Sequence, residues 1–207
     1  MAMSSAQDVR FSEARVKQGR DLANKMWNAS RLILLNAAEG AEPGPGSEKV
    51  EDRWIASRLQ RAIRSVSDSI EAYDFSHAAL DLYEFFWSEL CDWYLEIVKE
   101  RLYDGDPEAS ATLLWALDQV LALAHPIMPF VTEEIYSYLP SRSADALVVH
   151  DFPSTDESLL DPEAEREIGA VLEQTRGLRR WRDLAGVPAG QVLDARAPNG
   201  DPHELVA

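Results

Sequence analysis

Apolar residues recur along most of this chain with the three- and four-residue spacing that places side chains on one face of an α-helix. The longest clear stretch runs from residue 13 to residue 37, where the apolar and small residues fall on one broad arc of the helix. They are Val16, Gly19, Leu22, Ala23, Met26, Trp27, Ser30, Ile33, Leu34 and Ala37. We expect a long helix here, capped by Ser12, with this arc toward the core.

The same spacing predicts further helical segments. They span about residues 51–73, 76–102, 107–124, 129–139 and 161–184. Asp106 before Pro107 and Asp161 before Pro162 have the cap-then-proline order that begins helices, and Gly186 is suited to end the last one. The pattern therefore predicts a mainly α fold, a bundle of four or five long helices lying side by side.

Two places interrupt this pattern. The sequence HPIMPF, residues 125–130, predicts a tight, buried elbow with His125 as a hydrogen-bonded core residue. Residues 147–152 and 191–197 are short, β-branched and bounded by turn residues, so we expect two strands that pair.

These elements predict the division of the chain. We expect a polar lead over residues 1–11, a helical bundle over residues 12–144 and a small α/β C-terminal appendage over residues 145–207.

The arc of the first helix opposite its apolar side mixes cations with amides. It holds Lys17, Arg20, Asp21, Asn24, Lys25, Asn28 and Arg31. Such side chains suit phosphates and the edges of nucleic-acid bases, because amides both donate and accept hydrogen bonds. Periodicity alone leaves open that this is simply a solvated charged face.

The charge distribution makes this face more informative. The chain has a net charge of −16, yet residues 1–64 contain 11 Lys/Arg and 8 Asp/Glu. Residues 65–175 contain 4 and 24, and residues 176–207 contain 5 and 4. An acidic protein repels a polyanion on average, so nucleic acid would have to approach one of the two basic ends.

Two other groups of side chains have alternative interpretations. Arg53, Arg58, Arg61 and Arg64 could form a phosphate-binding stripe or could pair with carboxylates of the acidic middle segment. The aromatic residues between 83 and 94 could stack on bases, but the surrounding acidic residues favour core packing.

Other function classes lack their motifs. The single cysteine, Cys91, excludes an internal disulfide and is expected to be a small buried residue. No apolar run reaches the ~18 residues of a membrane span, which predicts a soluble, cytoplasmic protein. The sequence contains neither HExxH nor a Gly-x-Ser-x-Gly elbow, so no catalytic residue and no metal site is predicted.

The strings of residues nevertheless resemble one family closely. GRDLANKMWNASRLILL at 19–35 resembles the helix that opens the anticodon-binding domain of class I valyl-tRNA synthetases. DRWIASRL at 52–59, YEFFWSELCDWYLEIVKERL at 83–102, HPIMPFVTEEIY at 125–136 and TRGLRRWRDLAGVPAG at 175–190 follow in the family's order. The resemblance covers roughly residues 8–195 and implies the anticodon-binding helical bundle of class Ia aminoacyl-tRNA synthetases.

The resemblance also implies a site on the first helix. By transfer from the family motif, Lys25, Asn28, Arg31 and Leu32 would face the anticodon bases, with Asn24 and Arg20 supporting them or touching the backbone. Relatives often carry Phe at position 32, so Leu32 should replace a stacking contact with an apolar one.

For the intact protein the resemblance implies a valine-tRNA ligase that charges tRNA(Val) using ATP with Mg. Upstream catalytic and editing domains would perform the chemistry, because the HIGH and KMSKS signatures are absent here, and this chain alone should be inactive and need no cofactor. A match to an internal region also leads us to expect that Met1 and Ala2 were added, and the family's C-terminal coiled-coil arm is not expected in these residues. The alternatives are the anticodon domain of an isoleucyl- or leucyl-tRNA synthetase and a non-catalytic, protein-binding helical scaffold.

Overall fold

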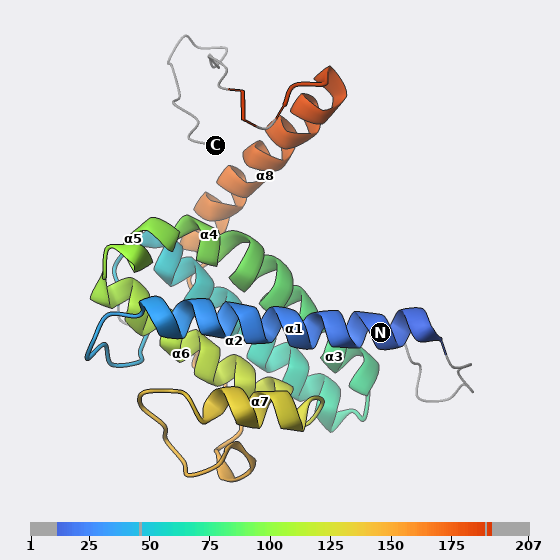
Figure 1. Cartoon of the computed structure of the whole chain (residues 1–207), viewed down its shortest axis with the longest axis vertical. Coiled ribbons are helices and arrows are strands. Elements are labelled where there is room, and N and C mark those ends of the chain that lie inside the picture. The colour runs from blue at the N-terminus through green and yellow to red at the C-terminus, as the bar shows by residue number, and fades with distance from the viewer. Residues whose placement is uncertain (1–11, 46, 189, 192–207) are drawn as a thin grey trace. The chain divides into compact units, whose positions relative to one another are not determined.

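A computed structural model describes residues 12–45, 47–188 and 190–191. All regular structure within these residues is helical, which confirms the predicted mainly α fold but not the strand expected at 147–152 (Figure 1). The helices are α1 (Glu13–Asn36), α2 (Val50–Glu71), α3 (Phe75–Tyr83), the π-helix η1 (Glu84–Tyr94), α4 (Leu95–Ile97), α5 (Lys99–Tyr103), α6 (Pro107–Ala124), α7 (Pro129–Tyr136), the 3-10 turns η2 (Leu147–Val149) and η3 (Glu157–Leu159), and α8 (Pro162–Ala185). No described helix is long and apolar enough to cross a membrane.

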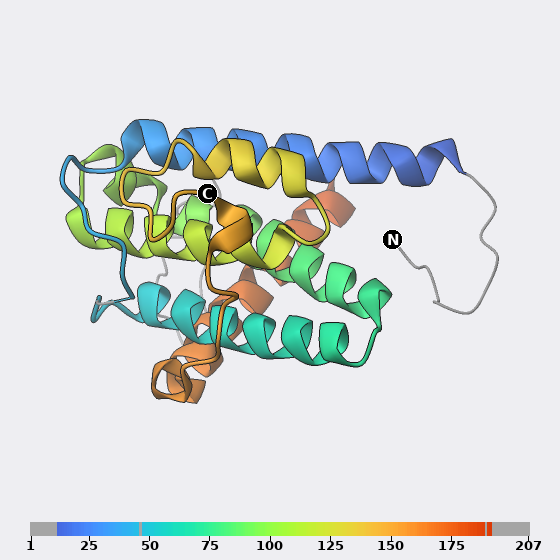
Figure 2. The same ribbon diagram turned by 90° about the horizontal axis from the view of Figure 1, so that it is seen from below.

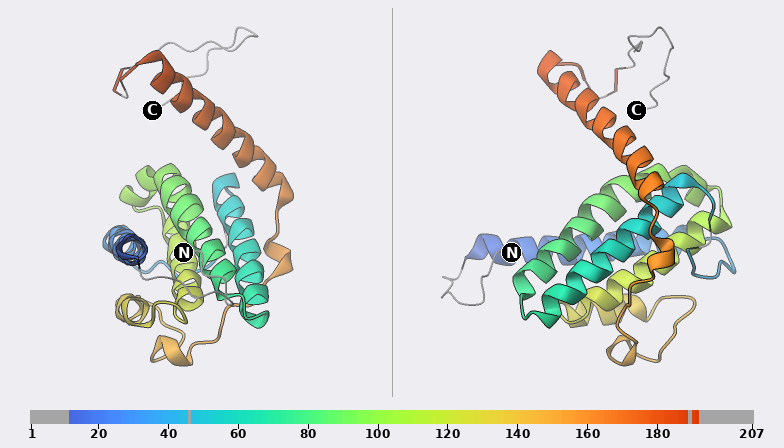
Figure 3. Two further views of the ribbon diagram at one scale, coloured as in Figure 1. Left: turned by 90° about the vertical axis from the view of Figure 1, so that its right-hand side faces the viewer. Right: turned by 180° about the vertical axis from the view of Figure 1, so that it is seen from behind.

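The central element of the bundle is α6, whose side chains are buried on nearly every side. A helix that is apolar all round belongs in a core. It contacts α1, α2, α3, α5 and α7. Figure 2 shows α1 and α7 side by side along one edge of the bundle and α2 along the opposite edge. The left view of Figure 3 shows α1 and α7 nearly end-on.

The first helix presents its predicted apolar arc to this core. Leu22, Met26 and Ile33 are buried, and the buried Ser30 hydroxyl donates to the carbonyl of Met26 at 2.7 Å. That internal bond lets a polar group lie in the core at little cost. Two members of the arc differ from the prediction, because Val16 and Trp27 are exposed.

Residues 75–103 follow the predicted third helix, but its middle is wound differently. Over η1 the chain forms a π-helix, and at its end the backbone N–H of Leu95 donates to the carbonyl of Leu90, five residues back. Wider turns shift the side chains relative to the spacing of an α-helix. Phe85, within η1, is buried, whereas Tyr83, the last residue of α3, was predicted for the core and is only half-buried.

A buried ion network connects α2, η1, α5 and the start of α6. The Asp52 carboxylate, 1% exposed, accepts from both terminal nitrogens of Arg101 at 3.0 and 2.9 Å and from the Tyr94 hydroxyl at 2.7 Å. Arg101 also donates to Asp106 at 2.8 Å, and Asp106 caps α6 by accepting from the N–H groups of Glu108 and Ala109. This network fixes η1, which forms one wall of the site described below.

Of the two predicted strands, one is wrong and the other is not tested. The strand expected at 147–152 is instead the 3-10 turn η2, where Val148 and Val149 are both exposed and Leu147 alone is buried. Without a partner strand the β-branched residues gain nothing from extension. The other expected strand, 191–197, lies almost wholly outside the described residues.

The predicted buried elbow is tight but open to solvent. The N–H groups of Ile127 and Met128 both donate to the carbonyl of Ala124, yet Phe130 is 90% exposed. His125 has a hydrogen-bond partner, since its Nδ1 lies 2.9 Å from the Thr132 hydroxyl. The turn thus satisfies its polar groups locally and leaves its apolar end uncovered.

The chain divides into two compact units, with the boundary between Glu165 and Arg166 inside α8. In the second unit the C-terminal end of α8 is closed by Arg182, whose guanidinium donates to the carbonyls of Pro188 and Gln191 at 2.5 and 2.8 Å. Gly186 follows with a positive φ of 66°, as expected for the residue that ends a helix. The functional division predicted at residue 145 stays a prediction.

Candidate nucleic-acid interface

The polar arc of α1 borders an open groove of about 410 Å³. Its lining residues are Asp21, Asn24, Lys25, Asn28, Ala29 and Leu32 from α1, with Cys91 and Leu95 from the helix beside it. Four of the six predicted site residues therefore line one depression. They come together because they are spaced three or four residues apart on one side of a helix.

The amides in the groove are available to a ligand. Asn24 and Asn28 are exposed, and their side chains have no hydrogen-bond partner among the residues that the structure describes. Each amide offers two donor hydrogens and an acceptor oxygen. This pairing of functions matches the mixed donors and acceptors on the edge of a nucleic-acid base.

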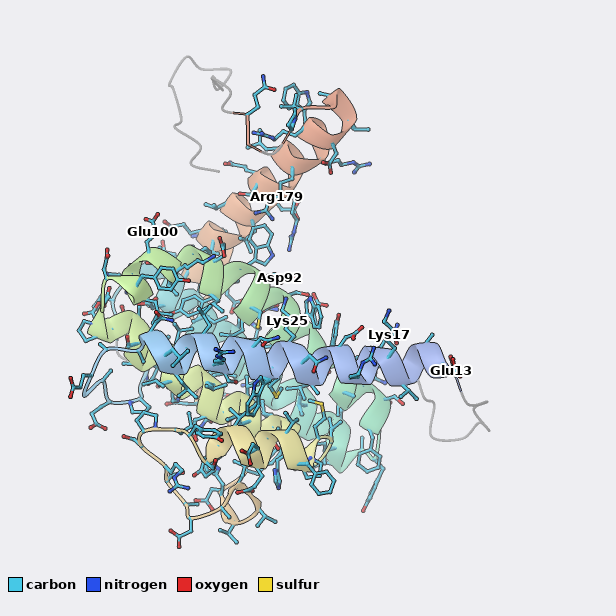
Figure 4. The ribbon with its side chains drawn as sticks, in the orientation of Figure 1. Glu13, Lys17, Lys25, Asp92, Glu100 and Arg179 are labelled. Carbon is cyan, nitrogen blue, oxygen red and sulfur yellow. The ribbon has the colours of Figure 1, made fainter. Side chains whose placement is uncertain are left out.

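Lys25 is held at the border of the groove by two contacts. Its Nζ lies 2.5 Å from a carboxylate oxygen of Asp92 on η1 and 4.2 Å from the centre of the Trp87 ring. Figure 4 shows Lys25 and Asp92 beside each other. The lysine charge is therefore oriented before any ligand binds, and it is partly neutralised.

The floor of the groove is apolar. Leu32 and Cys91 are half-buried and Leu95 is buried. Burial raises the pKa of the Cys91 thiol to about 12, and the nearby Lys25 charge lowers it only in part. Cys91 thus stays protonated at neutral pH and contributes an apolar surface, suited to the face of a base.

The two predicted arginines lie outside this lining. Arg20 is exposed and its Nε is 3.9 Å from Asp21, a loose contact. Arg31 is exposed and has no ion-pair partner within the described part of the chain. Both are on the same helix as the groove, where mobile cations reach a phosphate backbone.

The arginines of α2 are paired with carboxylates. Arg53 contacts Asp161 at 3.0 Å, Arg61 contacts Glu165 at 2.7 Å, and Arg64 contacts Glu157 at 2.9 Å. Arg58 donates two hydrogen bonds to Glu89, at 2.8 and 2.6 Å, and these bonds raise the pKa of its guanidinium. Of the two interpretations of this stripe, carboxylate pairing is the correct one.

Two features of this surface were missed by sequence reasoning. Asp92 was counted only as part of an acidic helix, and its contact with Lys25, 67 residues away, has no local pattern. Tyr83 and Trp87 were assigned to the core, although they form a half-buried stacked pair, with ring centres 5.2 Å apart. The four-residue spacing of the two aromatics was the available indication of the stack.

The described residues offer no group of three or more His, Cys, Asp and Glu side chains placed to hold a metal ion. The surface along α1 combines neutral amides, an oriented cation and an apolar floor. These are the components with which proteins recognise unstacked bases.

The chain matches one protein-family model, described as the anticodon-binding domain of tRNA ligase, over residues 52–197. Among curated proteins it is similar to a valine–tRNA ligase of Fervidobacterium nodosum, with 40% identity over 87% of this chain and 21% of that protein. A valine–tRNA ligase of Geobacter sulfurreducens has 40% identity over 98% of this chain and 24% of that protein, so that match includes α1. The chain thus spans less than a quarter of the length of these relatives.

Among solved structures, the chain is similar to a LeuRS–tRNA–LeuAMS ternary complex from Agrobacterium radiobacter. The TM-score is 0.51 with 20% identity, and the match covers 74% of this chain and 18% of the other. This likeness shows the shared fold.

Proposed function

Because this chain belongs to the family of anticodon-binding domains of tRNA ligases, we propose that it recognises the anticodon of tRNA(Val) through α1. The observation that carries the proposal is the groove along α1, where unpaired amides lie beside an oriented lysine over an apolar floor. Valine is favoured because the similar curated proteins named above are valine–tRNA ligases.

The groove suggests a role for each side chain. An unstacked anticodon base lies against Leu32, and Asn24 and Asn28 exchange hydrogen bonds with its edge. Lys25, at the groove border, and Arg31, on the exposed side of α1, take the phosphates or a base edge. Arg20, at the other end of the arc, contacts the phosphate backbone of the RNA.

In the whole protein this domain would serve a valine-tRNA ligase of the cytoplasm. The intact enzyme would join valine to tRNA(Val) with ATP and Mg. A catalytic domain would hold the ATP and the Mg. No step of that reaction falls to the residues of this chain, because they supply neither of the ATP-binding signatures of class I enzymes. Their contribution is to select the tRNA.

The test is a titration of this chain with the anticodon stem-loop of a valine tRNA. Lys25→Ala/Arg31→Ala removes two cations from the proposed surface, and Arg61→Gln/Arg64→Gln removes two cations that are paired elsewhere. We expect the first variant to raise the dissociation constant at least about 10-fold, since a hydrogen bond to a charged group contributes about 1.5–3 kcal/mol. The second variant should bind like the unmodified chain.

Equal losses in the two double variants would mean that the RNA senses only net charge, which overturns the assignment to α1. Indifference to RNA combined with binding of a basic protein would instead support the scaffold alternative.

A further inference from the structure

A second depression, of about 280 Å³, lies next to the groove along α1. Gln18 and Asp21 line it from α1, and Leu80, Tyr83 and Trp87 line it from α3 and η1. The rings of Tyr83 and Trp87 are stacked within 21° of parallel. Neither is fully buried, so this aromatic pair is ordered but faces an open space.

The two depressions are neighbours along α1. Asp21 lines both of them. Lys25 lines the groove while its Nζ lies over the Trp87 ring, so its charge is placed between the two. From Gln18 to Leu32 the helix rises roughly 21 Å, which is long enough to accompany several nucleotides of a single strand.

The chemistry of the second depression suits a base more than a phosphate. Aromatic rings stack on any base because every base has a π-face. The Gln18 amide can donate to and accept from a base edge, and the Asp21 carboxylate accepts from amino groups but repels phosphate. Lys25, whose Nζ lies over the Trp87 ring, stands at the end shared with the groove.

We infer that the depression lined by Gln18, Tyr83 and Trp87 is a stacking subsite for the base of the nucleotide next to those held in the groove. Lys25 then lies at the phosphate that links the two nucleotides. This inference rests on the proposed function and adds a second RNA contact, on α3 and η1, outside the helix to which recognition was assigned.

The experiment is a cycle that combines protein variants with RNAs lacking one base. The RNAs are the valine anticodon stem-loop and two versions with an abasic nucleotide directly 5′ or 3′ of the anticodon. The proteins are the unmodified chain, Trp87→Leu, Trp87→Phe and Trp27→Leu. Trp27 is a matched control because its ring is also partly exposed but packs edge-on against Tyr138, 6.3 Å away, on the α7 side of α1.

We expect Trp87→Leu to weaken binding of the intact RNA about 5- to 150-fold, the range for loss of one stacked base. Trp87→Phe should recover most of the affinity, and Trp27→Leu should change nothing. One of the two abasic RNAs should bind the unmodified chain more weakly than the intact RNA does, by a similar factor. The same abasic RNA and the intact RNA should bind Trp87→Leu with equal affinity. Such non-additivity means that the base and the ring act on each other.

Additive effects of Trp87→Leu and both abasic substitutions, or unchanged affinity of a folded Trp87→Leu chain, overturn the subsite. If a stem-loop with changed anticodon bases, titrated alongside, still binds the unmodified chain more weakly than the valine stem-loop does, the proposed function stands and this inference alone fails. If the unmodified chain binds none of the RNAs, both fail. Circular dichroism of each variant shows whether the helices are intact.

Discussion

The neighbours of Lys25 determine what this lysine can do. The resemblance to the family motif leads us to expect a cation that faces the anticodon, but the Lys25 ammonium contacts a carboxylate and an aromatic ring from η1. A phosphate that approaches must compete with Asp92 for the same charge. We therefore expect the ion pair to weaken the sequence-independent attraction of Lys25 to RNA and to fix the direction in which its ammonium points.

We predict that Asp92→Asn raises affinity for any anticodon stem-loop about 3- to 10-fold and reduces discrimination between anticodons. Freeing one cation should also steepen the dependence of log Kd on log salt by up to about 0.7, the value for one single-strand phosphate contact. The measurement is a titration at several salt concentrations.

The control for this variant is Asp81→Asn, which removes the same charge from an aspartate whose carboxylate accepts from Ser65. If both variants raise affinity equally, the effect is one of net charge, and the positioning role of Asp92 is wrong.

At the scale of the helices, Asp106 joins the cap of α6 to the ion network of Arg101. Partial burial alone would raise the pKa of Asp106, but hydrogen bonds from Lys49, Arg101 and two backbone N–H groups outweigh it. The net pKa is well below the usual value. A carboxyl whose folded pKa is depressed stabilises the fold above its unfolded pKa, about 3.9, and loses that contribution as the pH falls toward its folded pKa.

We predict that Asp106→Asn lowers the free energy of unfolding at pH 7 and that the deficit shrinks as the pH falls from about 4 to about 2. Asn is nearly as good a helix cap as Asp, so this change removes the charge and retains the cap. Urea unfolding of both proteins across this pH range measures the deficit. A deficit that stays constant with pH would show that the charge of Asp106 is not what stabilises the network.

The helix ends show what the sequence could predict. Asp106 with Pro107 and Asp161 with Pro162 begin α6 and α8 as expected, because caps and proline act on the residues next to them. The polar arc of α1 was likewise visible, and four of its residues do share one groove. Local rules and helical spacing are sufficient for these features.

The features that were not predicted depend on distant residues or on altered winding. Arg61 and Glu165 are 104 residues apart in the sequence, so no periodicity could identify them as partners. The π-helix η1 breaks the assumption of 3.6 residues per turn, and nothing in the periodicity indicated that change of winding. The failed strand at 147–152 needed a neighbouring strand, which no local pattern guarantees.

At the scale of the molecule, the cations of α2 are already paired. The chain carries a net charge of −16, and the four arginines of α2 are paired with carboxylates. Attraction through Arg20, Lys25 and Arg31 is therefore modest, and base contacts must supply much of the selectivity. Discrimination between anticodons therefore tests recognition by α1 more directly than total affinity does.

The most direct measurement is the ratio of dissociation constants for the valine anticodon stem-loop and for the same RNA with changed anticodon bases, at one salt concentration. We predict a ratio of about 10 or more for the unmodified chain, because a good pair of base contacts discriminates by about 1–3 kcal/mol. The ratio should fall toward one in Asn24→Ala/Asn28→Ala. Equal affinity of the unmodified chain for the two RNAs would contradict recognition of the anticodon by α1.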